Sequence, residues 1–394
     1  MTEKLYLCDS YSFQCQASII DLIDSGDTLD VGVSKTPFFP GGGGQPCDCG
    51  YINEFKVTAS YEINEIVYHK INRNNVSFNI GDLVFIKVDD SVRLERMRAH
   101  SGEHVFSGIA HRLFNVENVG FHMDEDCVMT VDFDRYLDSS NIKQLEIEVN
   151  KAIMNNSEIT ARTFSLAEAS EKEYRSKLVF TDDVRIVEIA GVDSCACCAP
   201  HVKSTGEIGC VKVLSSASHR SGVRIVLVCG LKALFEFEKR YSQILKISAL
   251  LCSKYDEAVS AVSELIDSNK SLHYDLDRIK SEHLSYIASK VSKSEIIFEF
   301  FEGLSNDDLR IINNNLKGKF SIMSLLLSGS DEIGYSYCVM SERIKLDEFA
   351  RDFNKNLSGS GGGRGIMIQG RIKARAADVI AFINEMKVEE YENA

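Results

Sequence analysis

Short runs of alternating hydrophobic and polar residues dominate the first ninety positions. The runs DVGVSKTPFF, KVTASYEI, EIVYHKI and DLVFIKVD are separated by polar turns. Successive side chains of a strand point to opposite faces, so this alternation predicts β-strands. Three of the four prolines, Pro37, Pro40 and Pro46, bracket the run GGGG, which indicates an ordered glycine loop. We expect residues 1–90 to form a small β-barrel that carries this loop.

The hydrophobic period changes after residue 90. Over residues 91–114, Met97, His100 and His104 recur at the three- and four-residue spacing of one helix face. The run CVMTVDFD alternates again, and VRIVEIAGV and GVRIVLVCG are typical of buried strands. Residues 91–230 are therefore predicted to form an α+β core.

Residues 231–291 contain no proline and are predicted to be helical. One hydrophobic seam repeats at 4-3-4-3 spacing, which is typical of a coiled coil or a helical hairpin. Its positions are Leu265, Asn269, Leu272, Leu276, Ile279, His283 and Tyr286. Residues 292–394 combine apolar runs, a glycine-rich loop and a final amphipathic helix, the pattern of a small α/β domain. The predicted class is thus α+β, and a homodimer through the helical or C-terminal region is one expectation.

The bulk composition is that of a globular protein. Hydrophobic residues make up 44% of the 394 positions and charged residues 26%. The start of the sequence lacks the features of a signal peptide and no apolar stretch is long enough to span a membrane, so we expect a cytoplasmic protein without membrane association. Twelve cysteines scattered through such a chain are more typical of free thiols or metal ligands than of disulfides.

The charge distribution is uneven. A net charge of -14 argues against indiscriminate nucleic-acid binding. The segment GGGRGIMIQGRIKARAAD nevertheless carries four basic residues before its first acid, and RLERMRAH carries three more. The four in the first segment are Arg364, Arg371, Lys373 and Arg375. Each basic island is compatible with an ordinary solvated surface or with the binding of one defined RNA shape.

Two short motifs point to a metal site. HSGEH places His100 and His104 one helical turn apart, a spacing shared by buried structural histidines and by the H-x-x-E-H motif of inverzincin peptidases. In CACCAPHVKSTGEIG, Cys197 and His201 are separated by three residues, so both can reach one ion from a tight turn. Together the two motifs offer three imidazoles and one thiolate for a tetrahedral site. A peptidase would need a carboxylate as its third ligand.

The combination of motifs resembles a known family. HSGEH followed by CCAPHVKSTGEIG is similar to the editing domain of alanyl-tRNA synthetase and to the freestanding AlaX-type alanyl-tRNA editing proteins. FFPGGGGQPCDCGYI resembles the family's glycine-rich segment, and SGGGRGIMIQG resembles its DHH-associated C-terminal domain. The resemblance covers nearly the whole chain. Because no synthetase catalytic domain precedes these motifs, we expect a freestanding protein that acts in trans.

The resemblance implies a function in translation fidelity. The expected reaction is hydrolysis of the ester between alanine tRNA and a wrong amino acid, serine with glycine as a second candidate, by an aminoacyl-tRNA hydrolase. The implied cofactor is Zn²⁺, held by His100, His104, Cys197 and His201, and the implied partner is tRNA. Glu103 would act as general base or orient a ligand. Gln45, which follows the glycines, would hold the tRNA terminus or the water, and the C-terminal basic residues Arg364, Arg371, Lys373 and Arg375 would bind tRNA.

Departures from the family pattern leave alternatives open. Cys195 and Cys198 lie near Cys197 and compete with it as the sulfur ligand, and Glu103 stands where synthetases commonly have threonine. Zinc in a four-ligand set can be structural rather than catalytic. A non-catalytic, zinc-stabilised RNA-binding protein is therefore a second hypothesis, and an inverzincin-type peptidase is a third. A DHH-type phosphoesterase would need an Asp-His-His tripeptide, which the sequence does not contain.

Overall fold

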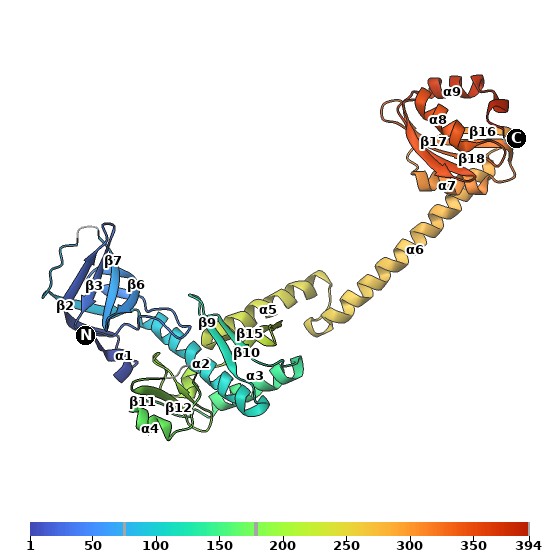
Figure 1. Ribbon diagram of the computed structural model, residues 1–394. Helices are drawn as coiled ribbons and strands as arrows, with labels where there is room; N and C mark the ends of the chain where they lie inside the picture. The colour runs from blue at the N-terminus through green and yellow to red at the C-terminus, as the bar shows by residue number, and fades with distance from the viewer. Residues whose placement is uncertain (74–75, 177–179, 393–394) are drawn as a thin grey trace. The chain divides into compact units, whose positions relative to one another are not determined.

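The computed structural model describes residues 1–73, 76–176 and 180–392. The chain divides into two compact units, Met1–Lys246 and Ile247–Ala394. Helices and several sheets occur along the chain, which confirms the predicted α+β class (Figure 1). The finer division into four domains stays a prediction. Within the described ranges, no helix combines the length and the apolar character needed to cross a membrane.

Six strands near the N-terminus hydrogen-bond in an order that closes into a barrel. Around the barrel they are β2 (Gln14–Asp24), β3 (Thr28–Val33), β7 (Ile66–Asn72), β6 (Phe55–Ile63), β5 (Gly50–Ile52) and β8 (Leu83–Val88). Alternate side chains such as Val31, Val33 and Ile71 are fully buried inside. The short elements α1 (Leu5–Cys8), β1 (Glu3–Lys4) and β4 (Lys35–Thr36) complete this region.

The glycine loop after β4 is fixed on two sides. All four of its glycines have positive φ, which favours glycine. Gly42 and Gln45 exchange two backbone hydrogen bonds of 3.0 Å. The carbonyl of Gly44 accepts from the backbone nitrogen of Met123 at 2.8 Å, and a β-carbon on Gly44 would lie 2.5 Å from the carbonyl oxygen of Phe121. The loop therefore docks closely against strand β9 (Asn118–Met123).

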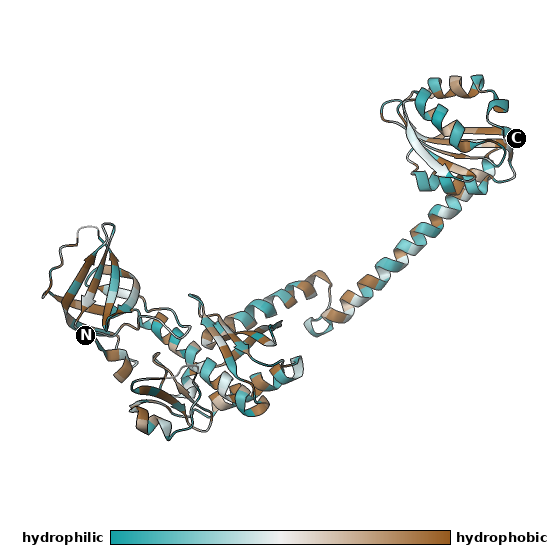
Figure 2. Ribbon diagram, viewed as in Figure 1, coloured by the Kyte–Doolittle hydropathy of each residue, from teal (hydrophilic) through white to brown (hydrophobic). Residues whose placement is uncertain are grey.

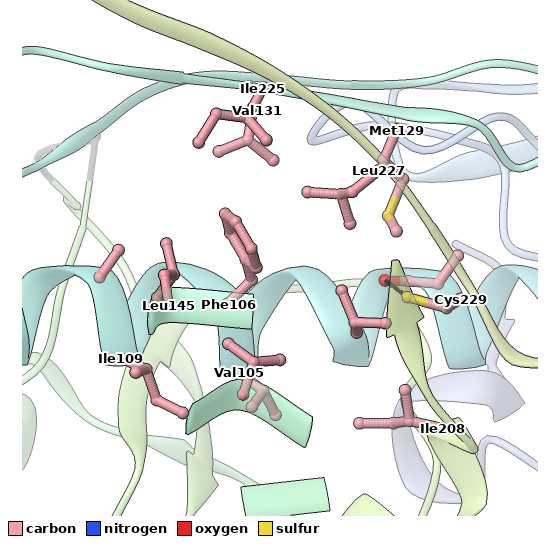
Figure 3. Close-up of a cluster of buried hydrophobic side chains, with 14 of the residues drawn as sticks. Val105, Phe106, Ile109, Met129, Val131, Leu145, Ile208, Ile225, Leu227 and Cys229 are labelled. Atoms are coloured by element: carbon pink, nitrogen blue, oxygen red, sulfur yellow. Dashed lines mark hydrogen bonds between the residues drawn. The ribbon is translucent and has the colours of Figure 1, made fainter. Parts of the chain in front are cut away.

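Helix α2 (Asp90–Phe114) is the central element of the first unit. Asp89 caps its start by accepting from two backbone nitrogens, and Asn115 ends it in the left-handed conformation. One face packs on a four-stranded sheet in the order β14 (Val211–His219), β15 (Gly222–Cys229), β10 (Met129–Phe133) and β9. Figure 3 shows side chains from α2 and this sheet in one buried cluster, among them Val105, Phe106, Ile109, Met129, Val131, Ile225 and Leu227.

A three-stranded antiparallel sheet carries the cysteine-rich segment. Its order is β11 (Ile159–Phe164), β12 (Val184–Ile189) and β13 (Asp193–Ala196). The guanidinium of Arg112, near the end of α2, donates to the carbonyl of Gly191 in the turn between β12 and β13 at 2.9 Å. This contact holds the β12–β13 hairpin against α2. The remaining elements of the unit are α3 (Ser139–Met154), α4 (Leu166–Ser170) and η1 (Thr205–Ile208).

The predicted helical stretch consists of two helices. They are α5 (Gly230–Leu250) and α6 (Ala258–Lys290), with the short turn η2 (Tyr255–Glu257) before α6. The predicted seam lies on α6, but Leu265, Leu272 and Leu276 are 58%, 66% and 61% exposed. An intramolecular hairpin that covers this seam stays a prediction, because α5 and α6 lie mainly in different units. A coiled coil between two copies stays a prediction.

The second unit contains a five-stranded sheet between helices. The sheet order is β16 (Ser294–Phe301), β17 (Phe320–Ser330), β18 (Gly334–Met340), β20 (Met367–Ile372) and β19 (Ser360–Arg364), and β16 and β17 run parallel. Apolar residues dominate its central strands (Figure 2). Leu325 and Leu327 pack with side chains of α8 (Leu346–Asn356) and α9 (Ala376–Glu385), whereas Leu326 packs with α7 (Asn306–Asn315). A turn, η3 (Val388–Glu390), follows α9.

Candidate metal centre

Helix α2 presents two histidines on one buried face. His100 and His104 are one turn apart, so their side chains project in the same direction, and their ring centroids are separated by 5.2 Å. They are only 2% and 3% exposed. Gly102 lies between them and lets α2 approach β15, because a β-carbon there would overlap the sulfur of Cys229.

Two further candidate ligands come from the loop after β13. Cys197 and His201 lie in this loop, and Arg185 of β12 fixes its backbone. The guanidinium of Arg185 donates to the carbonyls of Cys197 at 2.8 Å and Ala199 at 3.0 Å. The backbone nitrogen of Ala199 donates to Sγ of Cys197 at 3.5 Å. The loop is thus ordered around the sulfur.

These four side chains converge on one point. One ligand atom from each of His100, His104, Cys197 and His201 lies within 4.8 Å of the others. Sγ of Cys197 is 3.7 Å from Nε2 of His100 and 3.4 Å from Nε2 of His201. Three imidazole nitrogens and one sulfur are a donor set suited to tetrahedral Zn²⁺. The structure therefore brings together the four residues that the two motifs single out.

The other nitrogen of each imidazole faces a polar side chain. Nδ1 of His100 is 2.6 Å from Oε1 of Gln45, Nδ1 of His201 is 3.0 Å from Oγ of Ser101, and Nδ1 of His104 is 3.5 Å from Oδ2 of Asp193. Partners of this kind fix the tautomer and ring orientation of metal-binding histidines. With Nδ1 directed at these partners, Nε2 remains for a metal. This observation supports a fit between the donor set and a zinc ion.

Burial and mutual charge set the protonation of the cluster. Burial raises the pKa of Cys197, but His100 and His201 lower it, and the result lies well below the ordinary value. Burial lowers the pKa of His201 to about 3, so its imidazole is neutral. For His104, burial lowers the pKa whereas Asp193 and Cys197 raise it, with a net shift well upward. A cation would therefore find a thiolate and displace a proton from His104.

The neighbouring cysteines are placed differently from Cys197. Cys198 is exposed. Cys195 forms a separate group with His104 and Asp193. Burial raises the pKa of the Cys195 thiol, which makes it less ready than Cys197 to ionise. The geometry thus favours Cys197 as the sulfur ligand.

The two predicted catalytic residues lie beside the cluster and not in it. Gln45 contacts His100 as described, and its Nε2 is buried without a hydrogen-bond partner among the described residues. Glu103 is buried rather than solvated, with 5% exposure. Oε1 of Glu103 accepts from Oγ of Ser107 at 2.5 Å and from Nδ2 of Asn118 at 2.6 Å. Glu103 thus links α2 to β9.

The basic residues before HSGEH form internal contacts. Arg93 and Arg96 are 0% and 1% exposed. The guanidinium of Arg93 donates to the carboxylate of Asp48, just after the glycine loop, with Nε 2.9 Å from Oδ1. Nη2 of Arg96 lies 2.6 Å from the Glu125 carboxylate. An RNA-binding role for Arg93 and Arg96 is therefore wrong, because both side chains are buried and paired.

The four C-terminal basic residues lie in the second unit and are exposed. Arg364 ends β19, Arg371 belongs to β20, and Lys373 and Arg375 precede α9. Strand β19 is an edge strand made of SGGGR. The structure leaves these side chains accessible, so their predicted contact with tRNA stays a prediction.

Three residues at the candidate metal site could not be identified from the sequence motifs. Ser101 lies inside HSGEH, and Asp193 lies four residues before Cys197. Arg175 donates to both carboxylate oxygens of Asp193. The proximity of Ser101 and Asp193 to ligands in the sequence was the only signal that could have identified them.

Three family models match parts of the chain. The Threonyl and Alanyl tRNA synthetase second additional domain matches residues 184–226, which include Cys197 and His201. The model for tRNA synthetases class II (A) matches residues 10–92. The DHHA1 domain matches residues 285–389.

Whole-chain comparisons agree with these matches. The alanyl-tRNA editing protein AlaX-L of Pyrococcus horikoshii is 24% identical over 404 residues, which cover 96% of each chain. Alanine–tRNA ligases of Pyrococcus furiosus and Thermotoga maritima are 28% and 30% identical over 94% and 92% of this chain. The matched region spans only 42% and 44% of those ligases. The chain is thus a homologue of the AlaX-L alanyl-tRNA editing protein and contains the second additional domain and the DHHA1 domain.

Proposed function

We propose that this protein is a trans-editing aminoacyl-tRNA hydrolase that removes a wrong amino acid from alanine tRNA. Water is added across the ester, and the products are free amino acid and tRNA. The observation that carries the proposal is the convergence of His100, His104, Cys197 and His201 in a chain that aligns with AlaX-L over 96% of its length. We propose the cytoplasm as its location and a homodimer as its assembly.

The four converging side chains would hold Zn²⁺. When bound, the ion would supply a positive charge and Lewis acidity beside the ester carbonyl, or anchor the substrate. Nδ1 of His100 and His201 have neutral partners in Gln45 and Ser101, which hold both rings in place. The set contains no carboxylate, which disfavours the peptidase hypothesis.

Gln45 is the side chain best placed to act on the substrate. Its Oε1 is taken by His100, whereas its Nε2 is buried without a partner in the described chain. That amide would donate to the tRNA terminus or to the oxyanion that develops during hydrolysis.

Glu103 has less freedom. Its Oε1 already accepts two hydrogen bonds, from Ser107 and Asn118, which hold the carboxylate in place. These contacts support an orienting role for Glu103 over a general-base role.

The substrate class follows from the family likeness. We propose Ser-tRNA as the main substrate and Gly-tRNA as a second. A site that hydrogen-bonds the serine hydroxyl would leave polar groups unpaired with alanine and so spare the correct product. Arg364, Arg371, Lys373 and Arg375 would contact tRNA phosphates.

The proposal is tested by deacylation of alanine tRNA charged with serine, glycine or alanine. We expect the purified protein to hydrolyse the seryl ester, to spare the alanyl ester and to lose activity after zinc is stripped. Cys197→Ser should lose zinc and activity, whereas the matched variant Cys198→Ser should keep both. Zinc retained in Cys197→Ser would contradict the ligand assignment. Tight tRNA binding with no hydrolysis would favour the zinc-stabilised RNA-binding alternative, which the four-ligand set also suits.

A further inference from the structure

The β12–β13 hairpin places a buried carboxylate behind one candidate ligand. The side chain of Asp193, the first residue of β13, is 3% exposed, and its Oδ2 lies 3.5 Å from Nδ1 of His104. Nδ1 of His104 is buried and has no hydrogen-bond partner among the described residues, so the Asp193 carboxylate, at ion-pair distance, is the polar group that it faces. The hairpin can approach α2 this closely because position 108 is glycine, where a β-carbon would lie 2.6 Å from Cβ of Asp193.

Arg175 fixes the orientation of this carboxylate. Its Nε donates to Oδ1 of Asp193 and its Nη2 donates to Oδ2, both at 2.7 Å. Such a two-point contact sets the plane of a carboxylate as well as its position. The backbone of Arg175 is itself paired with β13, donating to the carbonyl of Ser194 at 2.8 Å and accepting from the nitrogen of Ala196 at 3.0 Å. The carboxylate is therefore held by a guanidinium whose own backbone is tied to β13.

His104 differs from the other two imidazoles in the charge of its partner. Gln45 and Ser101 are neutral partners of His100 and His201, whereas the partner of His104 is an anion. A carboxylate at the far nitrogen fixes the tautomer and makes the metal-facing nitrogen more basic. The carboxylate acts strongly on the imidazole here, because both groups are buried away from water.

We propose that Asp193, held by Arg175, is a positioning residue that aims Nε2 of His104 at the metal. The inference rests on the proposed zinc site and deepens it. Nδ1 of His104 faces the Asp193 carboxylate, so the ring cannot rotate without losing this contact. Metal affinity thereby depends on the β12–β13 hairpin as well as on the four ligands.

A second metal site made of His104, Asp193 and Cys195 is the competing interpretation of this cluster. Both oxygens of Asp193 already accept from Arg175. The guanidinium also places a fixed positive charge where a second cation would bind. The carboxylate is therefore better suited to serve His104 than to act as a ligand.

The chain offers a matched control for a purely structural ion pair. Asp132 of β10 accepts from Nε and Nη2 of Arg224 at 2.7 and 2.8 Å, the same two-point geometry, and Asp132 does not belong to the four-ligand group. Substituting Asp132 removes a salt bridge of the same geometry, although its carboxylate is 16% exposed against 3% for Asp193, without touching a ligand. The Asp132 variant therefore measures how the loss of such an ion pair affects the fold alone.

The test compares Asp193→Asn with Asp132→Asn in the full chain. Zinc affinity is measured by competition with a chromogenic chelator, and ligand geometry by the absorption bands of the Co²⁺-loaded protein. We expect Asp193→Asn to weaken zinc binding about 10–100-fold and to shift the Co²⁺ bands, whereas Asp132→Asn should match the unmodified protein. Arg175→Lys keeps a charge beside Asp193 but loses the two-point contact, so it should weaken zinc binding to a smaller degree.

The outcomes separate the inference from the site on which it rests. If Asp193→Asn and Arg175→Lys both bind zinc as tightly as Asp132→Asn, the positioning role is wrong while the zinc site stands. If the unmodified protein binds no zinc, the zinc site itself fails and the inference fails with it. Should Asp193→Asn not fold, Arg175→Lys alone decides: unchanged zinc affinity and unchanged Co²⁺ bands would overturn the role.

Discussion

At the scale of single residues, the oxygen and the nitrogen of the Gln45 side-chain amide have different surroundings. Its oxygen contacts His100, and its nitrogen is buried with no partner among the described residues. Leaving a buried donor unsatisfied costs about 1–3 kcal/mol. A bound substrate that accepts a hydrogen bond from Nε2 of Gln45 would remove this cost, and we expect the substrate to do so.

Gln45→Glu separates the two roles of this side chain. Glutamate keeps an oxygen acceptor for His100 but has no amide donor. We therefore expect zinc binding to persist and deacylation of Ser-tRNA to fall about 10²–10³-fold, the loss typical of removing one oxyanion donor. Single-turnover hydrolysis and chelator competition measure the two effects. Gln45→Ala is the comparison and should lose zinc as well. Normal hydrolysis by Gln45→Glu would show that the amide does not act on the substrate.

At the scale of elements, the close packing of the β12–β13 hairpin on α2 predicts that overpacking at this contact weakens zinc binding. Gly108→Ala would push a β-carbon against Asp193, whereas Gly102→Ala would push one against Cys229 of β15. Overpacking of this kind costs about 1–3 kcal/mol, so both variants should be less stable. Gly108→Ala should weaken zinc binding more than Gly102→Ala, because it displaces the hairpin behind His104. Thermal unfolding of the apo protein and zinc affinity are the two measurements. Equal zinc affinity in both variants would contradict this coupling.

The ion pair between Lys280 of α6 and Asp308 of α7 predicts that the stability of the second unit depends on pH. Burial raises the pKa of Asp308, but the Lys280 ammonium, 2.7 Å away, and the Ser305 backbone and hydroxyl lower it below the ordinary value. A carboxylate with a lowered pKa in the folded state stabilises the fold above its unfolded pKa of about 4. That contribution is lost as the pH falls through the folded pKa.

Asp308→Asn should therefore destabilise the second unit by about 1 kcal/mol at pH 7. The difference from the unmodified protein should shrink as the pH falls below about 4. Hydrogen exchange of the β17 backbone amides measures the stability of the second unit separately from that of the first. Asp307→Asn is the control, because the Asp307 side chain is 75% exposed. A destabilisation that stays constant down to low pH would show that charge is not the cause.

Some elements could be predicted from the sequence and others could not. Alternation along the chain predicted β-strands and an α+β class, and helical spacing predicted α2. A helical hairpin was one prediction for this segment, but the position of the break between α5 and α6 could not be predicted because the segment contains neither glycine nor proline. Cys252 adopts a φ of 51° there, a conformation for which cysteine gives no sequence signal. The exposed seam of α6 shows that periodicity predicts a face but does not identify its partner.

At the scale of the whole molecule, the candidate site joins segments that are far apart in the sequence. The two ligand motifs could be predicted to meet because each sets its own local geometry: one turn of helix in HSGEH and one tight loop from Cys197 to His201. The side chains that contact Nδ1 of the three histidines could not be predicted, because they depend on which ring nitrogen faces which neighbour. That choice is set by the packing of the hairpin and the glycine loop against α2, which no local spacing encodes.

The charge distribution of the whole chain predicts how it would bind tRNA. With a net charge of -14, the chain gains no general attraction for phosphate, so affinity must come from local cations. Arg364, Arg371, Lys373 and Arg375 are exposed in the second unit, which folds around its own core. If they hold tRNA, their loss should weaken binding without changing the chemical step.

Arg364→Gln combined with Arg375→Gln should therefore raise the KM for Ser-tRNA and leave single-turnover hydrolysis at saturation unchanged. Each lost phosphate contact should also reduce the slope of log affinity against log salt by roughly 0.7–0.9. Lys293→Gln combined with Lys317→Gln removes two exposed charges from the same unit and is the matched control. Because both double variants lower the net charge equally, a difference between them reports position and not total charge. Equal affinities and equal salt slopes would show that the arginines beside the glycine-rich strand do not contact tRNA.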